Sequence, residues 1–278
     1  MQNVTSFEKI KNTDSRLWQL LVMASLLMIG VWLRDFSLKP EQIALTFSAG
    51  LLTQAIFLHY FQLQQRGFLS SFITCFGLCL LLRCSNLWVH PCVAILAISS
   101  KFLIRFQHSH LFNPANLGVI LGLTLFPQTW VTSGQWGSDL STVLWFIAAG
   151  FFVANNARRI DISAYFLCCY AALFLSIRVF WYGYSLDVFL HQFENGALLL
   201  FTFFMITDPL TIPRHRTGRA IHAALVAIFA YLWQYVFYGN QGIIWGLFFA
   251  SFFVPLWNYL FPAPLYQWRT LSVGALND

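Results

Sequence analysis

The chain has 278 residues, of which 58% are hydrophobic, 18% aromatic and only 9% charged, whereas a typical soluble domain is about 25% charged. So few charges cannot cover a soluble protein of this length, and a chain with 30 Phe and 11 Trp residues would not stay disordered. The formal net charge is +6, and the basic residues lie in short gaps between apolar runs. This distribution indicates membrane topology rather than nucleic-acid binding. The composition therefore predicts a polytopic membrane protein.

Ten apolar runs form the predicted membrane segments. In chain order they are Leu17–Leu33, Ile43–Leu63, Phe68–Leu82, Trp88–Ile104, Leu117–Phe126, Thr142–Ala154, Ile162–Trp181, Val188–Ile206, Ala220–Tyr238 and Ile243–Phe261. The runs that end at Phe126 and Ala154 are shorter than the roughly 17–25 residues of a straight span, so we expect broken or half-inserted helices there. The predicted fold is all-α, with a cytoplasmic tail (1–16), a first membrane repeat (17–126), an outer loop (127–141), a second membrane repeat (142–262) and a cytoplasmic tail (263–278).

The basic residues predict the orientation of these segments. With the N-terminus inside, twelve of the sixteen Lys and Arg residues fall in alternate connections on one side, and positive charge stays cytoplasmic. An even number of segments places both termini on that side. The lipid bilayer is the first expected partner, and the bacterial plasma membrane is the expected location.

Two polar, proline-containing interruptions, residues 105–118 and 207–219, break the apolar pattern. Their prolines, Pro114 and Pro209, are 95 positions apart, which suggests an internal repeat. Paired broken segments in two halves of a transporter mark helices whose ends face a ligand. The alternative is a pair of cytoplasmic loops in which Asn-Pro and Asp-Pro simply start helices.

These interruptions contain most of the candidate site residues. Asp208 would either orient a polar ligand or act as a helix N-cap beside the neighbouring arginines. The arginines could hold a phosphate, an anionic lipid or a partner subunit. The candidates for cofactor or substrate binding are Asn113, Pro114, Asn116, Thr207, Asp208 and Pro209, and those for anion, lipid or partner binding are Arg214, Arg216 and Arg219.

Glu194 is a further candidate for cofactor or substrate binding. It precedes the uninterrupted apolar run 198–206, and a carboxylate within a membrane segment is a functional hypothesis by default. The alternative is a deep outer loop in which Asn195-Gly196 forms a turn and only 197–206 is inserted. Both interpretations stay open on the sequence alone.

Enzyme signatures are missing from the chain. It has no G-x-S-x-G elbow, no Walker A loop, no dinucleotide fingerprint and no H-E-x-x-H motif. The six cysteines lie in or beside apolar runs, where they behave as small hydrophobic residues, and we expect no metal site from them. No catalytic residue is predicted, and any enzymatic role would be that of a cofactor-holding subunit.

Two sequence blocks carry a family resemblance. They are His110-Leu-Phe-Asn-Pro-Ala-Asn-Leu-Gly118 and Phe203-Phe-Met-Ile-Thr-Asp-Pro-Leu-Thr-Ile-Pro213, the second followed by Gly218-Arg219. Over residues 40–262 the chain resembles the NqrB/RnfD family, whose members are membrane components of the sodium-pumping NADH:quinone reductase and of the Rnf electron-transport complex. The resemblance is closest to a short stand-alone branch named after enediyne biosynthesis clusters. It implies two related five-helix halves, similar to urea transporters, and flavin-linked electron transfer within a multi-subunit membrane complex.

One motif of that family is absent. Its members in those complexes carry a Ser/Thr-Gly-Ala-Thr box in the outer loop, and the last Thr bears covalent FMN. Here Ser133-Gly134 is followed by Gln135 and Trp136, so we expect no covalent FMN. Electron transfer would then need a non-covalent flavin, either FMN or riboflavin, because no side chain has a suitable redox potential.

Two functions follow as hypotheses. The first is a membrane subunit of a flavin-linked electron-transport system, which could also translocate ions and would bind other redox subunits or a soluble electron carrier. The alternative is a membrane transporter for a small polar or flavin-like solute, which the repeat and the missing FMN acceptor motivate.

Overall fold

The computed structural model describes residues 14–34, 36–63, 67–106, 109–131, 134–136 and 140–267. Most of the two predicted tails therefore lies outside the described residues. A helix lies on each of the ten predicted apolar segments. The first five segments contain α2 (Ser15–Leu33), α3 (Pro40–Tyr60), α4 (Phe68–Leu81), α5 (Val89–Leu103) and α6 (Pro114–Leu125).

The second five segments contain more breaks. They comprise α7 (Leu140–Asn156), α8 (Ile160–Phe174), α9 (Leu186–Phe193), α10 (Gly196–Leu200), α11 (Arg216–Tyr231), α12 (Gly242–Ser251) and α13 (Val254–Leu260). Three π-helical stretches continue α8, α10 and α11, namely η2 (Leu175–Trp181), η3 (Phe201–Met205) and η4 (Leu232–Val236). Such stretches are frequent at functional sites.

Helix length and composition fit an integral membrane protein. Among the described residues, four helical stretches are long and apolar enough to cross a bilayer, and two bent pairs bring the total to as many as six. The bent pairs join α9 to the helix Gly196–Met205 at 51° and α12 to α13 at 48°. Shorter apolar helices, including the twelve-residue α6, supply the half-helices expected in the middle of the chain. The protein is an all-α polytopic membrane protein.

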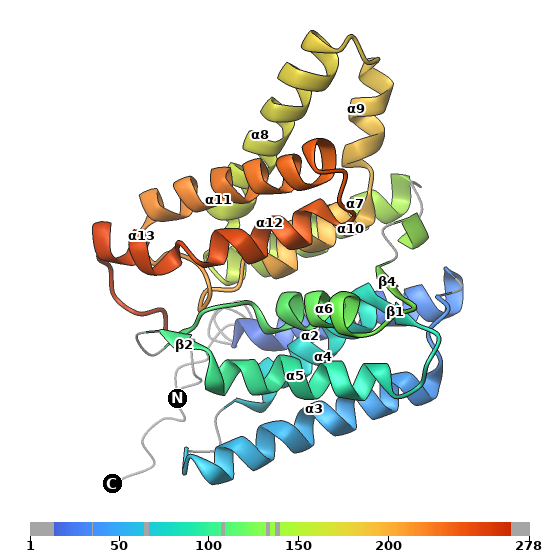
Figure 1. Ribbon diagram of the computed structural model, residues 1–278, viewed down its shortest axis with the longest axis vertical. Coiled ribbons are helices and arrows are strands. Elements are labelled where there is room, and N and C mark those ends of the chain that lie inside the picture. Colours follow the sequence, from blue (N-terminus) through green and yellow to red (C-terminus); the bar gives the residue numbers. More distant parts are fainter. Residues whose placement is uncertain are drawn as a thin grey trace, which may run out of the picture.

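The same packing pattern occurs in both sets of five segments. In the first set α3 packs against α5 and α2 against α4, and in the second set α8 packs against α11 and α7 against the helix of α10 and η3. Figure 1 shows the first set, coloured blue to green, on one side of the molecule and the second set, yellow to red, on the other. Helices α6 and α12 pack against each other where the two sets meet.

The two interruptions do not occupy equivalent positions in the two sets, so the predicted repeat of Pro114 and Pro209 is wrong. Asn113-Pro114 starts the fifth segment of the first set, whereas Asp208-Pro209 follows the third segment of the second set. Helix α11 does not begin until Arg216. The two motifs instead face each other across the contact between the sets.

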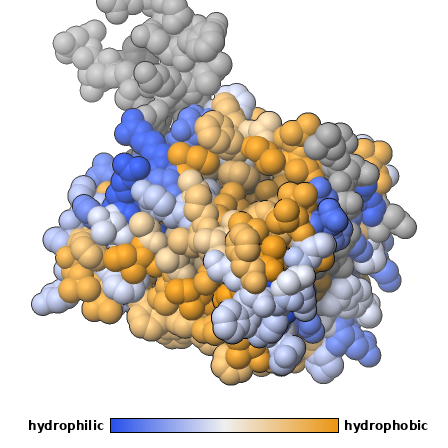
Figure 2. All heavy atoms as spheres, turned by 90° about the horizontal axis from the view of Figure 1, so that it is seen from above, coloured by the Kyte–Doolittle hydropathy of each residue, from blue (hydrophilic) through white to orange (hydrophobic). Residues whose placement is uncertain are grey.

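Apolar side chains dominate the surface that faces lipid. Figure 2 shows them across the middle of one face, with hydrophilic residues gathered toward its sides. Phe180, Trp181 and Tyr238 are more than three-quarters exposed. Exposure of large apolar groups on this scale indicates contact with a bilayer or with other membrane subunits.

Two short strand pairs close the connections between helices. Strand β1 (Leu82–Cys84) pairs with β4 (Thr129–Val131), and β2 (Arg105–Phe106) pairs with β3 (Ser109–His110), both antiparallel. These hairpin-like contacts hold the loops on either side of α6.

Trp136 fixes the loop that follows β4. It lies in a 3-10 turn, Gly134–Trp136, and is 1% exposed. Its ring packs edge-on against Phe36 and Phe146, each at a centroid distance of 4.8 Å. A Cβ atom at Gly196 would come within 2.5 Å of the Trp136 Cβ, so only glycine at 196 lets α10 start beside this ring.

We expect Trp136→Ala to lower the free energy of unfolding by about 3–5 kcal/mol, because it leaves a cavity among three packed elements. Thermal unfolding of the detergent-solubilised protein measures the change. Trp181→Ala is the matched control, since Trp181 is 82% exposed, and it should shift the midpoint little. Equal losses in the two variants would contradict the packing described here.

Candidate functional site

The first turn of α6 positions the centre of the site. Asn113 is the N-cap residue, and its side-chain Oδ1 accepts a hydrogen bond from the Asn116 backbone N–H at 3.1 Å. Pro114 occupies the first helical position, where its missing N–H is harmless and its fixed φ favours the helix. The Asn-Pro-x-Asn pattern therefore starts this helix by ordinary capping.

The same Asn113 side chain also reaches the second set of segments. Its Nδ2 donates to the carbonyl oxygen of Met205 at 3.3 Å and lies 3.4 Å from Oδ2 of Asp208. Met205 is the last residue of η3, where carbonyl groups lack partners within the helix. One carboxamide thus satisfies the start of α6 and the end of η3 together.

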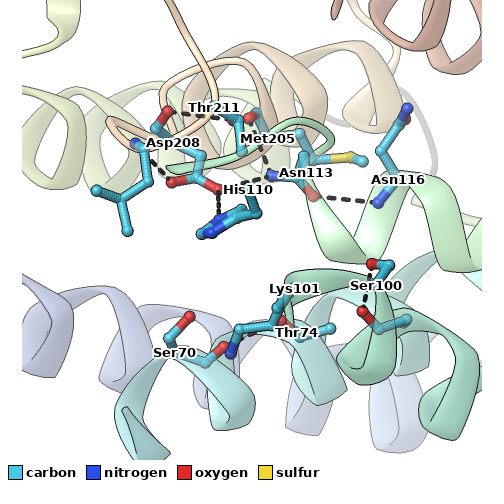
Figure 3. A network of polar contacts seen from close by, with 12 residues as sticks. Ser70, Thr74, Ser100, Lys101, His110, Asn113, Asn116, Met205, Asp208 and Thr211 are labelled. Carbon is cyan, nitrogen blue, oxygen red and sulfur yellow. Dashed lines mark hydrogen bonds and ion pairs between the residues drawn. The ribbon is translucent and has the colours of Figure 1, made fainter. Parts of the chain in front are cut away.

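Asp208 forms the other half of this contact. Its Oδ1 accepts from the backbone N–H of Leu210 at 3.2 Å, which is an Asx turn around Pro209. Its Oδ2 faces Asn113 and lies 3.7 Å from Nε2 of His110 on β3. Figure 3 shows Asp208, His110 and Asn113 pointing toward one another. The carboxylate is therefore held by a turn on one side and by two polar groups on the other.

A small cavity, here called the Asp208 cavity, opens beside these groups. Its volume is about 50 Å³, room for a few water molecules. Five of the predicted site residues line it, together with Arg16 and side chains of α2, α4 and η3. The five are Asn113, Pro114, Thr207, Asp208 and Pro209.

Asn116 lies one turn further along α6 and is 1% exposed. Its Nδ2 donates to the Ile244 carbonyl oxygen of α12 at 3.1 Å, so it joins the two sets of segments a second time. Its Oδ1 is buried and accepts no hydrogen bond from the described residues. A buried acceptor without a partner is costly.

Glu194 lies elsewhere, so the prediction that it shares the site is wrong. It is the C-cap residue of α9, its side chain is half exposed, and its nearest ionic partner is His191 at 3.8 Å. Asn195 caps the following helix. Glu194 lines neither this cavity nor the second one described below. The chain does break before Gly196, but residues 186–193 form helix α9 rather than the outer loop of the alternative interpretation.

The three arginines have different environments. Arg219 is 8% exposed and forms an ion pair with Asp161 of α8 at 2.6 Å, so its charge is used within the protein. Arg216 is exposed and donates to the Tyr165 hydroxyl at 2.8 Å. Arg214 is partly exposed. Arg219 is therefore removed from the residues predicted to bind an anion, a lipid or a partner. That prediction now rests on Arg214 and Arg216.

Tyr266 and Arg159 pack together outside the membrane segments, at the end of the molecule where the three arginines lie. The Arg159 guanidinium lies 4.7 Å from the Tyr266 ring centroid, and the phenol donates to the Ala157 carbonyl oxygen at 3.2 Å. Burial raises the pKa of Tyr266 above its ordinary value, and the charge of Arg159 opposes that rise. The phenol therefore stays protonated at neutral pH and acts as a donor.

Lys101 is a residue that sequence reasoning missed, because it was counted only as a topological charge. It is 8% exposed within α5, and its Nζ donates to Gln54 Oε1 at 3.2 Å and to Ser71 Oγ at 3.3 Å. Figure 3 shows it beside Ser70 and Thr74, which line the Asp208 cavity. It is near enough to Asp208 for an electrostatic interaction. Its place inside an apolar run was the available signal.

A second cavity, here called the Gln241 cavity, lies along the helix Gly196–Met205, from Asn195 to Met205. Its volume is about 300 Å³, and Met205 and Ile244 form part of its wall. Met205 also lines the Asp208 cavity. The two cavities are therefore separated by the contact that Asn113 and Asn116 make with η3 and α12.

Comparison with known families decides the relationship. The NQR2, RnfD, RnfE family matches residues 130–266. The matched part of the chain, residues 130–266, belongs to this family. Asp208 lies within the matched residues, whereas Asn113 precedes them, and no curated protein matches the chain. Membership supports a membrane subunit of an Nqr/Rnf-type complex.

We expect Asn113→Asp to lower the free energy of unfolding by about 1–3 kcal/mol, because the carboxylate cannot donate to Met205 and it faces Asp208. Asn195→Asp is the matched control, since Asn195 is also an N-cap and Asp caps as well as Asn does. Thermal unfolding at neutral pH measures both changes. A loss at position 195 as large as that at 113 would show that the second contact of Asn113 contributes nothing.

Proposed function

We propose that this protein is the membrane subunit of a flavin-linked electron-transport system of the Nqr/Rnf type, with a non-covalent flavin at the Asp208 cavity. The observation that carries the proposal is the meeting of Asn113 and Asp208 at one cavity between the two sets of segments. Family membership supplies the electron-transport context. The two polar groups supply recognition inside an otherwise apolar bundle.

The donor set suits the polar edge of a flavin ring. That edge carries an N–H group between two carbonyl groups. Asp208 Oδ2 would accept from the N–H, and Asn113 Nδ2 would turn from Asp208 to a ring carbonyl group. Arg16 at the cavity wall and Lys101 behind it would stabilise negative charge on a reduced ring. A volume of about 50 Å³ is too small for three fused rings, so binding requires the flexible side chains of Met23 and Met205 to move aside.

Two residues after β4 favour non-covalent over covalent binding. Trp136 stands where family members carry the acceptor threonine, and its side chain is buried. Gln135, next to it, accepts from Arg83 Nε at 3.2 Å. Both residues that replace the end of the attachment box therefore pack within this protein. FMN or riboflavin held only by non-covalent contacts is the cofactor that we propose.

The surroundings suggest where partners bind. Arg214 and Arg216, near the Asp208 end of the molecule, provide positive charge for an anionic lipid headgroup or an acidic soluble electron carrier. Exposed apolar side chains on the membrane face suit other redox subunits. We place the protein in the bacterial plasma membrane with both termini in the cytoplasm, as the distribution of basic residues favours.

Acid precipitation tests the cofactor. Protein extracted in mild detergent should release a flavin into the acid supernatant, seen by its absorbance and fluorescence. Asp208→Ala should lower the flavin retained per protein about tenfold or more, because one buried charge-assisted hydrogen bond is lost. Asp187→Ala, at an exposed carboxylate of α9, should retain the parent amount. Colourless parent protein, or equal retention in the two variants, would refute the proposal.

A second function is favoured by the pair of cavities that share Met205. Two cavities along one broken helix suit a transporter for a small polar or flavin-like solute. Proteoliposomes should then take up riboflavin, and Asn113→Ala should abolish uptake by loosening the contact between the cavities. Uptake no faster than in empty liposomes would exclude riboflavin transport and leave electron transport as the proposed function.

A further inference from the structure

We propose that the Gln241 cavity binds a second ligand, an uncharged cyclic amide or imide. The cavity measures about 300 Å³, which is the lower end of the range for small-molecule sites. It extends along the helix Gly196–Met205, from Asn195 to Met205. The proposal does not depend on a flavin at Asp208, because the two cavities share no polar side chain.

The lining excludes a charged ligand. None of the described residues that line this cavity is charged, and its polar groups are carboxamides and phenols. An ion taken from water into such a site would lose hydration without gaining an opposite charge. A neutral molecule loses far less, so the lining selects against both anions and cations.

Three glutamine side chains present acceptors to the cavity. The Nε2 groups of Gln192, Gln234 and Gln241 donate to the Tyr170 hydroxyl, the Tyr235 hydroxyl and the Val131 carbonyl oxygen, at 3.4, 3.5 and 3.1 Å. Each amide therefore uses one of its two N–H groups within the protein. Its Oε1 accepts no hydrogen bond from the described residues and remains available for an N–H group of a ligand.

The first turn of α12 presents donors to the same space. Gln241 precedes this helix in a left-handed conformation, with φ at 62°, and its side chain does not cap the helix. The first N–H groups of a helix have no intrahelical partner, and Gly242 and Ile243 both line the cavity. A ligand carbonyl group would find these donors beside the glutamine acceptors, which is the pairing that an amide or imide needs.

Apolar and aromatic side chains complete the lining and suit a flat ring. They include Leu81, Phe201 and Ile244, together with Tyr170 and Tyr238. Phe201 belongs to η3 and Gln234 to η4. Two π-helical stretches therefore contribute to one cavity, and helices of this kind cluster at binding sites.

Backbone strain at the rim supports the same conclusion. Tyr238, with φ at 55°, and Gln241 are both left-handed residues other than glycine, which is uncommon. Gly242 at the start of α12 is required by close packing, because a Cβ there would lie 2.5 Å from the Ala230 carbonyl oxygen and 2.8 Å from Gln234 Oε1. Strained residues of this type collect at ligand sites.

Lumichrome, a fluorescent uncharged ring with an imide edge, is the probe. It is titrated against detergent-solubilised protein that carries Asp208→Ala, so that the Asp208 cavity does not compete. We expect saturable quenching of its fluorescence. In the same background, Gln234→Leu and Gln192→Leu should each weaken binding about tenfold, because each removes one acceptor. Gln62→Leu, at an exposed glutamine outside the cavity, should leave the affinity unchanged.

A ligand control separates the imide from general ring stacking. Lumichrome methylated at the imide nitrogen keeps the ring and lacks the N–H, so it should also bind about tenfold more weakly. Equal affinity for the two ligands, equal affinity in Gln234→Leu, Gln192→Leu and Gln62→Leu, or no binding in any protein would overturn the proposal. Unchanged gel-filtration elution of the leucine variants shows that they are folded. Flavin retention by parent protein tests the Asp208 cavity independently.

Discussion

The contact that Asn113 makes with both sets of segments is the constraint on which the site depends. Its Oδ1 caps the start of α6, and its Nδ2 satisfies the end of η3 and faces Asp208. Both helix ends are buried within the protein, away from water, so their backbone groups must find partners there. One carboxamide meets both needs, and it brings a carboxylate to the same point.

The membrane segments could be predicted from the sequence because hydropathy and length alone determine them, and Asn-Pro at 113–114 is an ordinary helix start. The site could be predicted only in part. The sequence shows Asn113 and Asp208 as polar residues that interrupt apolar runs. Their mutual contact depends on packing between α6 and η3, and no local sequence pattern determines that packing. For the same reason the ion pair of Arg219 with Asp161 and the exposure of Glu194 could not be foreseen.

The two cavities differ in a way that suggests different ligands. The Asp208 cavity has a carboxylate, an arginine and a nearby buried lysine, whereas the Gln241 cavity has only neutral polar groups among its described residues. Charge inside an apolar bundle is expensive and is kept where function needs it. A charged cavity suits chemistry that changes charge, such as reduction of a ring, and a neutral cavity suits recognition by hydrogen bonds alone.

A double-mutant cycle on Asn113 and Asp208 tests the central claim most directly. The free energy of unfolding is measured in mixed detergent and denaturing surfactant for the parent, Asn113→Ala, Asp208→Ala and the double variant. If the two side chains interact across the contact, the loss of unfolding free energy in the double variant will differ from the sum of the two single losses by about 0.5–3 kcal/mol. Strict additivity would mean that the two motifs act independently, and it would contradict the account.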